Sequence, residues 1–276
     1  RIPRALGVSR ALIMAPTYSD YADACANNGV EVEYLVTEAA ANFVPDMDLL
    51  RDRAKGVDGV FFCNPNNPTG VYTPVEEIEV VARDCPEATF IVDESYLPFV
   101  DGYGDHGMAE RGLPNVVAMH SLSKMFCIPG LRIGLCHAPR RIAERLREYA
   151  EPWSVNTLAQ EAVRFITGNP DLAAEHVRRT REYLVAEHAA FAEAFADARD
   201  ITAYPGTATF VLFGLAAGTA AELVGDMLRE RFLLRDCANF HGLSDGYFRV
   251  AFKSGDANRN IARLIARWAA GRSRVA

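Results

Sequence analysis

The stretch VVAMHSLSKMFCIPGLRIG, residues 116–134, begins as a buried strand and continues as a polar, cationic segment. Its first residues are all apolar, which is typical of a strand in the middle of a sheet. Two hydroxyls and an amine follow at Ser121, Ser123 and Lys124, and a guanidinium follows at Arg132. Because hydroxyl and cationic groups suit an anion, the stretch predicts a reactive, anionic ligand at the end of a strand.

Short apolar segments of the same kind recur through the first half of the chain, separated by segments with helical spacing. They are ALIMAP (11–16), VEVEYLV (30–36), DGVFFCNP (58–65), TFIVDES (89–95), VVAMHS (116–121) and GLCHA (134–138). Between them, residues 73–85 read as a helix, with Thr73 as its N-cap and Pro74 in its first turn. Continuous apolar strands that alternate with helices predict an α/β fold, in which helices cover both faces of a mainly parallel sheet.

The second half of the chain has a different pattern. Long helices begin at Pro139, and the last of them, from Asp171 to about Ala198, has the length of a helix that bridges two lobes. Short strands then alternate with helices at 218–231 and 256–271; the strands are ITAYP, TFVLFGL, FLLRDC and YFRVAF. We therefore expect a large domain at 1–165, an interdomain helix at 166–198 and a smaller α+β domain at 199–276. We also expect that an N-terminal segment of the large domain is missing, because the chain opens at what reads as the end of a helix.

Composition argues against several classes of function. The chain has 276 residues, with 29 basic and 36 acidic side chains and a formal charge of −7, and it contains no Lys/Arg block. We therefore expect no nucleic-acid partner. No apolar run approaches the roughly 18 residues that span a bilayer, so we expect no membrane contact and a cytoplasmic location. The six cysteines and six histidines are dispersed, which predicts no metal site.

Polar side chains follow several of the predicted strands at the point where each strand ends. Tyr18 follows the first strand, Asn67 follows the third, and Asp93 and Tyr96 follow the fourth. Lys124 follows the fifth. Because ligands of doubly wound sheets bind beyond the carboxyl ends of the strands, we expect these groups to share one site.

Pyridoxal phosphate is a cofactor that uses all of these groups. A lysine amine condenses with its aldehyde, and a carboxylate keeps its ring nitrogen protonated, for which Lys124 and Asp93 are the candidates. Asn67 and Tyr96 suit its phenolic oxygen, and Tyr18 suits its ring face. Ser121, Ser123 and Arg132 suit its phosphate. Singly, each has an ordinary structural explanation, such as a solvated lysine or a Pro/Asn turn, so the prediction depends on the combination.

The motifs NPNNPTG (64–70), DESY (93–96), SLSK (121–124) and GLRIG (130–134), in this order, resemble fold-type-I pyridoxal-phosphate enzymes of the class I and II aminotransferase superfamily. The resemblance covers essentially the whole chain. It implies the three-layer fold of those enzymes, with Lys124 as the lysine that bonds to the cofactor. It also implies the catalytic roles of Asp93 and Tyr18 and the cofactor contacts proposed above.

The small-lobe sequence narrows the resemblance. Residues 233–254, LLRDCANFHGLSDGYFRVAFKS, are similar to the threonine-phosphate decarboxylase branch, which is close to the histidinol-phosphate aminotransferases. By resemblance, Arg249 binds the substrate α-carboxylate, Arg235 meets the substrate phosphate, and Asn156 approaches the cofactor or substrate. The implied function is decarboxylation of L-threonine O-3-phosphate to (R)-1-amino-2-propanol O-phosphate in cobalamin biosynthesis. The alternative is transamination of histidinol phosphate or a related phosphorylated amine.

The resemblance also implies a homodimer that acts on a small phosphorylated amino acid, with the site at the subunit interface. The family's glycine-rich phosphate loop and a tyrosine from the partner subunit normally precede the strand at 11–16, and this chain does not contain them. We therefore expect that the chain as given binds the cofactor poorly. An alternative of another class is a non-catalytic binding module, but the presence of Lys124, Asp93 and Arg249 argues against it.

Overall fold

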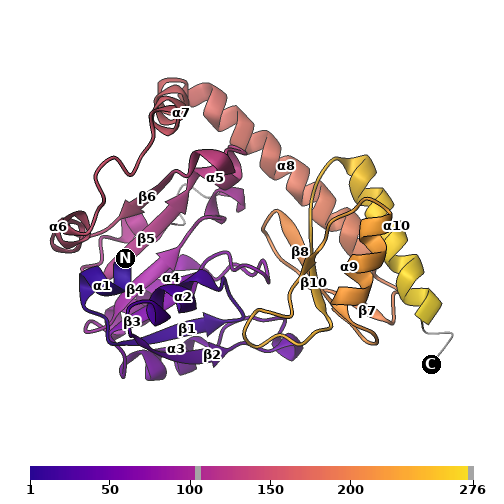
Figure 1. Ribbon diagram of the computed structural model, residues 1–276, viewed down its shortest axis with the longest axis horizontal. Coiled ribbons are helices and arrows are strands. Elements are labelled where there is room, and N and C mark those ends of the chain that lie inside the picture. The colour runs from indigo at the N-terminus through magenta and orange to yellow at the C-terminus, as the bar shows by residue number, and fades with distance from the viewer. Residues whose placement is uncertain (103–106, 273–276) are drawn as a thin grey trace.

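The computed structural model describes residues 1–102 and 107–272, which form two sheets connected by a long helix (Figure 1). The larger sheet has six strands, and all neighbours run parallel except the last pair. Its strands are, in order across the sheet, β2 (Glu31–Val36), β1 (Arg10–Ala15), β3 (Gly59–Cys63), β4 (Thr89–Asp93), β5 (Val116–Ser121) and β6 (Gly134–His137). The strands predicted for the first half of the chain thus form one sheet, and the expected α/β fold is confirmed.

Helices cover both faces of this sheet because successive side chains of a strand point in opposite directions. Leu12 and Met14 of β1 pack into a core with α3 (Met47–Ala54) and α4 (Val75–Asp84). Ala11 and Ile13 pack into a second core on the other face, beside α1 (Ile2–Leu6) and α2 (Asp20–Ala26). The three layers of the predicted fold follow from this alternation.

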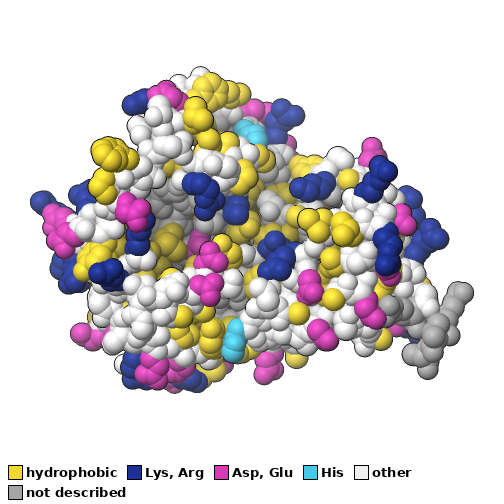
Figure 2. Space-filling view, viewed as in Figure 1, with side chains coloured by type: hydrophobic (Ala, Val, Ile, Leu, Met, Phe, Trp, Pro, Cys, Tyr) yellow, Lys and Arg dark blue, Asp and Glu magenta, His cyan; other side chains and the backbone are white. Residues whose placement is uncertain are grey.

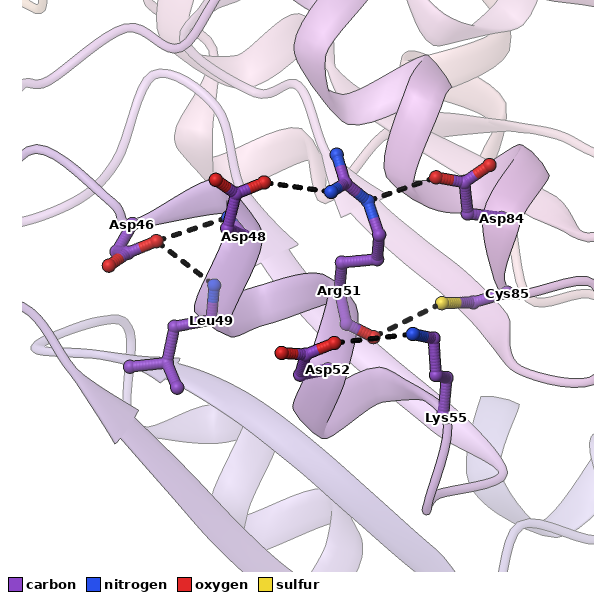
Figure 3. A network of polar contacts seen from close by, with 8 residues as sticks. All are labelled: Asp46, Asp48, Leu49, Arg51, Asp52, Lys55, Asp84 and Cys85. Atoms are coloured by element: carbon purple, nitrogen blue, oxygen red, sulfur yellow. Dashed lines mark hydrogen bonds and ion pairs between the residues drawn. The ribbon is translucent and has the colours of Figure 1, made fainter.

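A polar network fixes the helices of one outer layer (Figure 3). Asp46 caps α3 by accepting hydrogen bonds from the backbone N–H groups of Asp48 and Leu49. Arg51 of α3 then pairs with Asp84 of α4 at 2.9 Å. The predicted N-cap of α4 is wrong: the helix begins at Val75 after Pro74, because Thr73 is held by backbone hydrogen bonds to the Asn64 side chain.

The edge strand β6 differs from the sequence expectation because it runs antiparallel to β5. A parallel partner requires a crossover of a dozen or more residues that passes over the sheet. The connection between β5 and β6 instead folds into two short turns, α5 (Leu122–Met125) and η5 (Pro129–Leu131), at one end of the sheet. All residues of β6 are exposed, so the helical layers do not extend over this edge in the described part of the chain.

The smaller sheet is antiparallel and lies in the second half of the chain. Its order is β7 (Ile201–Ala203), β8 (Phe210–Leu215), β10 (Tyr247–Ala251) and β9 (Arg235–Asp236). It shares a core with α9 (Ala220–Arg229) and α10 (Gly255–Arg272). The predicted strand at 232–237 is shorter than expected, because Phe232 N–H donates to Met227 O and so belongs to the end of α9.

The helices α6 (Arg140–Glu148), α7 (Thr157–Gly168) and α8 (Pro170–Ala194) lead from one sheet to the other, and α8 runs diagonally between them in Figure 1. Near the start of α8, His176 Nε2 lies 2.8 Å from Met125 O of the large lobe. Further along, His188 Nε2 lies 2.7 Å from Ala208 O beside β8. The helix is therefore attached to both lobes, while the domain boundaries proposed from sequence stay a prediction.

Close backbone contact also joins the lobes. Thr207 N–H donates to Gly70 O at 2.8 Å, and a Cβ on Gly206 would lie 2.9 Å from Gly70 Cα. Glycine is therefore required on both sides of this contact. No helix among residues 1–102 and 107–272 is both long enough and apolar enough to cross a membrane.

Candidate active site

A cavity of about 200 Å³ lies beyond the carboxyl ends of the central strands of the larger sheet. Its lining contains every residue that the sequence assigned to cofactor contact, from four separate stretches of the chain. The lining residues are Tyr18, Tyr21, Cys63, Asn67, Asp93, Ser95, Tyr96, Ser121, Ser123, Lys124 and Arg132. The structure therefore brings the predicted group together, and the role of each member stays a prediction.

Asp93 is the last residue of β4, and its carboxylate is held at both oxygens. The Tyr21 hydroxyl donates to Asp93 Oδ2 at 2.6 Å. The backbone N–H and the hydroxyl of Ser95 both donate to Oδ1, at 3.0 and 2.5 Å. Donors on both oxygens fix the plane of the carboxylate.

Lys124 lies in α5, one short step beyond the end of β5. Its ammonium lies 5.9 Å from the centre of the Tyr96 ring, and no carboxylate of the described residues is within ion-pair distance of it. Tyr96 itself is 9% exposed, and burial raises the pKa of its hydroxyl. An amine without a carboxylate partner at the mouth of a cavity is available to react with a bound ligand.

The hydroxyl and guanidinium groups near Lys124 come from the two sides of the β5–β6 connection. Ser121 ends β5, and the buried Ser123 lies in α5, where its hydroxyl is 3.4 Å from Ile133 O. Arg132 adopts a left-handed backbone conformation, φ 54°, and its guanidinium donates to Pro129 O at 3.3 Å. The reversal of the chain into β6 thus places these groups beside one cavity.

The NPNNPTG segment divides its asparagines between structure and site. Asn64 is fully buried and bonds to the backbone of Thr73. Asn66 ties the end of β1 to this segment through Thr17 and Pro16. Asn67 is left to line the cavity, and its Oδ1 accepts a hydrogen bond from Arg249 Nη1 of the small lobe.

Arg249 reaches the site from β10 and is mostly buried. Its guanidinium lies 4.5 Å from the centre of the Phe210 ring, and burial lowers its pKa. Its Nε is buried and has no hydrogen-bond partner among the described residues. A buried guanidinium with an unused donor indicates that an acceptor is supplied from outside the chain.

Arg235 lies directly opposite Arg249 in the pairing of β9 with β10. It is exposed, and its Nη2 donates to Asn239 Oδ1 at 2.8 Å while its guanidinium lies 5.2 Å from the centre of the Phe240 ring. Like charges directly opposite each other destabilise a strand pair. The pair of arginines is therefore explained best by anionic groups that bind between or beside them.

A second cavity, of about 430 Å³, adjoins the first and shares Tyr18 with it. It lies between the large lobe and the loop at 238–243, and Asn239 and His241 line it from the small-lobe side. Tyr18 is 42% exposed, and a hydrogen bond with Asp20 and burial raise the pKa of its hydroxyl to about 12. Its ring is therefore accessible from both cavities.

Asn156 is placed differently from the other predicted residues. Its Oδ1 accepts from Ala159 N–H at 2.9 Å and caps α7, while its Nδ2 donates to Leu131 O at 2.9 Å. It is not among the residues that line either cavity. Its observed contacts hold the chain next to Arg132, and direct contact with a ligand stays a prediction.

Sequence reasoning missed Tyr21, Ser95 and Cys63, which also line the cavity. Tyr21 could have been found from its position in the first helix after β1, one turn beyond Tyr18. Ser95 could have been found as the residue two places after Asp93, where a hydroxyl commonly closes a turn onto the aspartate. Cys63 pairs with Asp93 in the β3–β4 register and gives no separate signal in the sequence.

The residues present fit pyridoxal phosphate. Its phosphate, aldehyde, ring nitrogen, phenolic oxygen and ring face each have a complementary group in the cavity lining. The carboxylate of Asp93 is oriented by its hydrogen-bond donors, as the partner of a ring nitrogen must be. Among the described residues, no group of three or more His, Cys, Asp or Glu side chains could hold a metal ion.

Comparison with known proteins identifies the family of the chain. The family model for aminotransferase class I and II matches residues 2–267. A putative threonine-phosphate decarboxylase of Caldanaerobacter subterraneus is 30% identical over 272 residues, which cover 95% of this chain and 71% of the relative. Threonine-phosphate decarboxylase of Salmonella typhimurium is 31% identical over 259 residues, which cover 93% of this chain and 70% of the relative.

Two further matches describe the fold and the neighbouring branch. The crystal structure of L-threonine-O-3-phosphate decarboxylase from Porphyromonas gingivalis has a TM-score of 0.84 and 31% identity, covering 97% of this chain and 79% of that one. Histidinol-phosphate aminotransferase of Methanoculleus marisnigri is 29% identical over 255 residues, with 92% of this chain and 68% of the relative covered. With a family model that spans nearly its whole length and a site of matching composition, the chain belongs to the class I and II aminotransferase family.

Proposed function

We propose that the chain is a pyridoxal-phosphate-dependent decarboxylase that converts L-threonine O-3-phosphate to (R)-1-amino-2-propanol O-phosphate. The observation that supports it most is the cross-strand pair of Arg235 and Arg249. A substrate with a phosphate and a carboxylate neutralises both cations, whereas a substrate with one anionic group leaves one guanidinium unmatched. The relatives named threonine-phosphate decarboxylase are consistent with such a substrate.

The cofactor-binding roles are part of the proposal. Pyridoxal phosphate, when bound, supplies an aldehyde for the amine and an electron-withdrawing ring that accepts the electron pair of the broken bond. Asp93 holds the ring nitrogen, Tyr18 lies against the ring, and Asn67 and Tyr96 hold the phenolic oxygen. Phosphate binding falls to the remaining polar lining, namely Ser121, Ser123 and Arg132.

Arg249 and Arg235 determine the reaction by orienting the substrate. Arg249 has an unused, buried Nε–H donor for the α-carboxylate and is itself fixed by Asn67. Arg235 holds the phosphate at the other end. A substrate held at two points cannot rotate freely. The two arginines would therefore keep the bond between the α-carbon and the carboxylate in the orientation that its cleavage requires. A small rotation would expose the α-hydrogen to Lys124 instead, and transamination would result.

The second candidate is therefore an aminotransferase acting on histidinol phosphate or a related phosphorylated amine. It is favoured by relatives named histidinol-phosphate aminotransferase, which match nearly the same share of this chain as the decarboxylases do. Such a substrate has a phosphate for Arg235 but no carboxylate for Arg249. The amino acceptor of the second half-reaction would supply that carboxylate.

One experiment separates the two candidates. The purified protein with pyridoxal phosphate is given L-threonine O-3-phosphate alone and, separately, histidinol phosphate with 2-oxoglutarate, and the products are identified by mass spectrometry. Loss of CO2 from threonine phosphate without a keto acid is the expected result. Formation of glutamate in the second mixture, with threonine phosphate unchanged, would refute the decarboxylase in favour of the aminotransferase.

The proposal includes a cytoplasmic homodimer that serves cobalamin biosynthesis. One relative is the adenosylcobalamin biosynthesis bifunctional protein of Leptospira interrogans, 24% identical over 270 residues. Apolar side chains lie exposed on α7 and on the loop before it, including Trp153 (97% exposed), Leu158 and Phe165. Figure 2 shows such side chains over this part of the molecule, and elsewhere on the visible face acidic and basic groups are mixed. Light scattering would test for the dimer.

A further inference from the structure

Tyr21 is a buried tyrosine of the first cavity that the proposed reaction does not yet use. It lies in α2 and is 6% exposed. Its ring stacks on Phe61 with centroids 5.6 Å apart, and it meets the Tyr18 ring edge-on at 5.7 Å. Its hydroxyl donates to Asp93 Oδ2 at 2.6 Å. Tyr21 therefore touches two of the residues to which we assign cofactor contact.

The hydroxyl is explained by Asp93 and not by packing. Phenylalanine at this position would keep both ring contacts and would not bury a polar group. Burial, together with the negative charge of Asp93, raises the pKa of the Tyr21 hydroxyl well above its usual range, so it remains a proton donor at physiological pH. The hydroxyl lies 2.6 Å from the Asp93 carboxylate, and the Cys63 thiol is its other polar neighbour.

The bonds to Asp93 have a geometric consequence. Ser95 occupies Oδ1 and Tyr21 occupies Oδ2, so the carboxylate cannot turn about its last torsion without losing a bond on one side. Ser95 lies two residues along the same chain segment, whereas Tyr21 comes from a different element, α2. Of these two donors, Tyr21 is the one that fixes Asp93 relative to the wall of the cavity that carries Tyr18.

We propose that Tyr21 is a positioning residue that orients the Asp93 carboxylate toward the ring nitrogen of the bound cofactor. The inference rests on the proposed function, in which Asp93 is the partner of that nitrogen. It assigns to the Tyr21 hydroxyl an effect that depends on the nitrogen atom. The hydroxyl should therefore not affect the binding of a ligand that has the same shape but lacks the nitrogen.

The test compares two ligands. Pyridoxal phosphate and its 1-deaza analogue, in which carbon replaces the ring nitrogen, are titrated into cofactor-free protein, and dissociation constants are measured by absorbance. Tyr21→Phe should weaken the binding of pyridoxal phosphate by about tenfold, the usual effect of one hydrogen bond to a charged group. Binding of the deaza analogue should change by less than about twofold. Tyr183→Phe, which removes a hydroxyl from α8 outside the cavity, is the matched control and should change neither.

The outcomes separate the inference from the proposed function. Equal weakening of both ligands would mean that Tyr21 is a packing residue, and unchanged binding of both would mean that its hydroxyl is not used; either result overturns the inference alone. Failure of the unaltered protein to bind either ligand would overturn the proposed function and the inference with it. If Tyr21→Phe does not fold, 3-fluorotyrosine at position 21 keeps the hydroxyl as a stronger donor. It should then tighten the binding of pyridoxal phosphate selectively, and an equal change for both ligands would again refute the inference.

Discussion

The two halves of the candidate site are built in different ways. In the large-lobe half, Asp93, Asn67 and Tyr96 sit at the ends of buried strands, and both oxygens of Asp93 are hydrogen bonded. In the small-lobe half, Arg235 is exposed on a two-residue strand at the edge of its sheet, and its side chain contacts the Asn239 side chain and the Phe240 ring. The large-lobe side chains are therefore held in place by the protein alone. The position of Arg235 instead depends on the position of the small lobe.

The halves meet through a few contacts that could transmit a change in lobe position. Arg249 bonds to Asn67 across the junction. The His241 ring stacks on Tyr34 of β2, with centroids 3.7 Å apart and planes 14° apart. Because Asn239 lies in the same loop as His241, this stack also locates the side chain that holds Arg235. The proposed cofactor-binding residues can thus stay fixed while the position of Arg235, the proposed phosphate ligand of the substrate, changes with the small lobe.

The largest expected effect tests the pre-assembled half. Lys124→Ala removes the amine that bonds to the cofactor, so decarboxylation should fall by at least about a thousandfold. The absorbance of the covalently bound cofactor should vanish as well. Lys55→Ala, which removes a surface lysine at the C-cap of α3 that pairs with Asp52, is the control and should leave both unchanged. A rate for Lys124→Ala close to that of the unaltered protein would show that this half is not catalytic.

The next effect separates the two arginines of the small-lobe half. Arg235→Gln should lower kcat/KM for threonine phosphate by about a hundredfold, because it removes a charge-assisted contact to the phosphate. Binding of unphosphorylated L-threonine should hardly change. Arg249→Gln should weaken the binding of both threonine phosphate and L-threonine, because both ligands carry the α-carboxylate. If Arg235→Gln weakened the binding of threonine phosphate and of L-threonine equally, Arg235 would support the fold of the lobe and would not recognise phosphate.

A smaller effect concerns the junction between the halves. Gly206→Ala places a Cβ 2.9 Å from Gly70 Cα, so the backbones must move apart. We expect the free energy of unfolding to fall by about 1–3 kcal/mol, as for other overpacked positions. Gly225→Ala, at a position of α9 where an added Cβ meets no atom within 4 Å, should instead stabilise by up to about 1 kcal/mol. Thermal denaturation of both variants measures the difference, and equal melting temperatures would show that the junction is loose.

The last prediction concerns a buried pair behind the large-lobe half, next to Asp93. Glu94 is fully buried, and burial raises its pKa from 4.5 to about 8, while burial also lowers the pKa of His120, whose Nε2 lies 3.2 Å from Glu94 Oε2. Both shifts favour the neutral forms of Glu94 and His120. Since the folded state keeps the Glu94 proton that the unfolded state releases, stability should decline as pH rises from about 4.5 to about 8.

Glu94→Gln isolates this contribution. The amide keeps an acceptor for Met108 N–H and cannot ionise. Relative to the variant, the unaltered protein should lose stability with a slope of at most about 1.4 kcal/mol per pH unit over that range, measured by denaturant unfolding. The titration of His120 acts in the opposite direction below its ordinary pKa, and the comparison of two proteins that both contain it removes most of its effect. Parallel curves for the two proteins would show that Glu94 is ionised in the folded state.

Sequence alone located the larger sheet and predicted a group of residues that do line one cavity, because strand ends in a parallel sheet converge on one edge. The apolar runs set the strands, and the polar residues just after them therefore had to lie together. Tyr21 and Ser95 were missed because each acts on Asp93 and has no ligand-binding chemistry of its own. Such supporting residues depend on side-chain direction, which spacing along the chain does not determine.

The errors lie where local bonds compete with a longer pattern. Threonine is a common N-cap residue, but the backbone N–H and C=O of Thr73 are hydrogen bonded to the Asn64 side chain. The apolar run at 232–237 suggests a longer strand, yet its first residue closes the end of α9. In each case a hydrogen bond to a distant or adjacent backbone group decided the outcome.

The long helix α8 constrains how this molecule can diversify. Its anchors, His176 on the large lobe and His188 on the small lobe, belong to one rigid rod. Inserting a single residue between them would turn one anchor by about 100° relative to the other and shift it by about 1.5 Å. Side chains of the smaller sheet can be substituted without disturbing this alignment. The number of residues of α8 between His176 and His188 cannot change without disturbing it. New substrate preferences are therefore accessible by substitution within the small lobe, and insertions and deletions are confined to its loops.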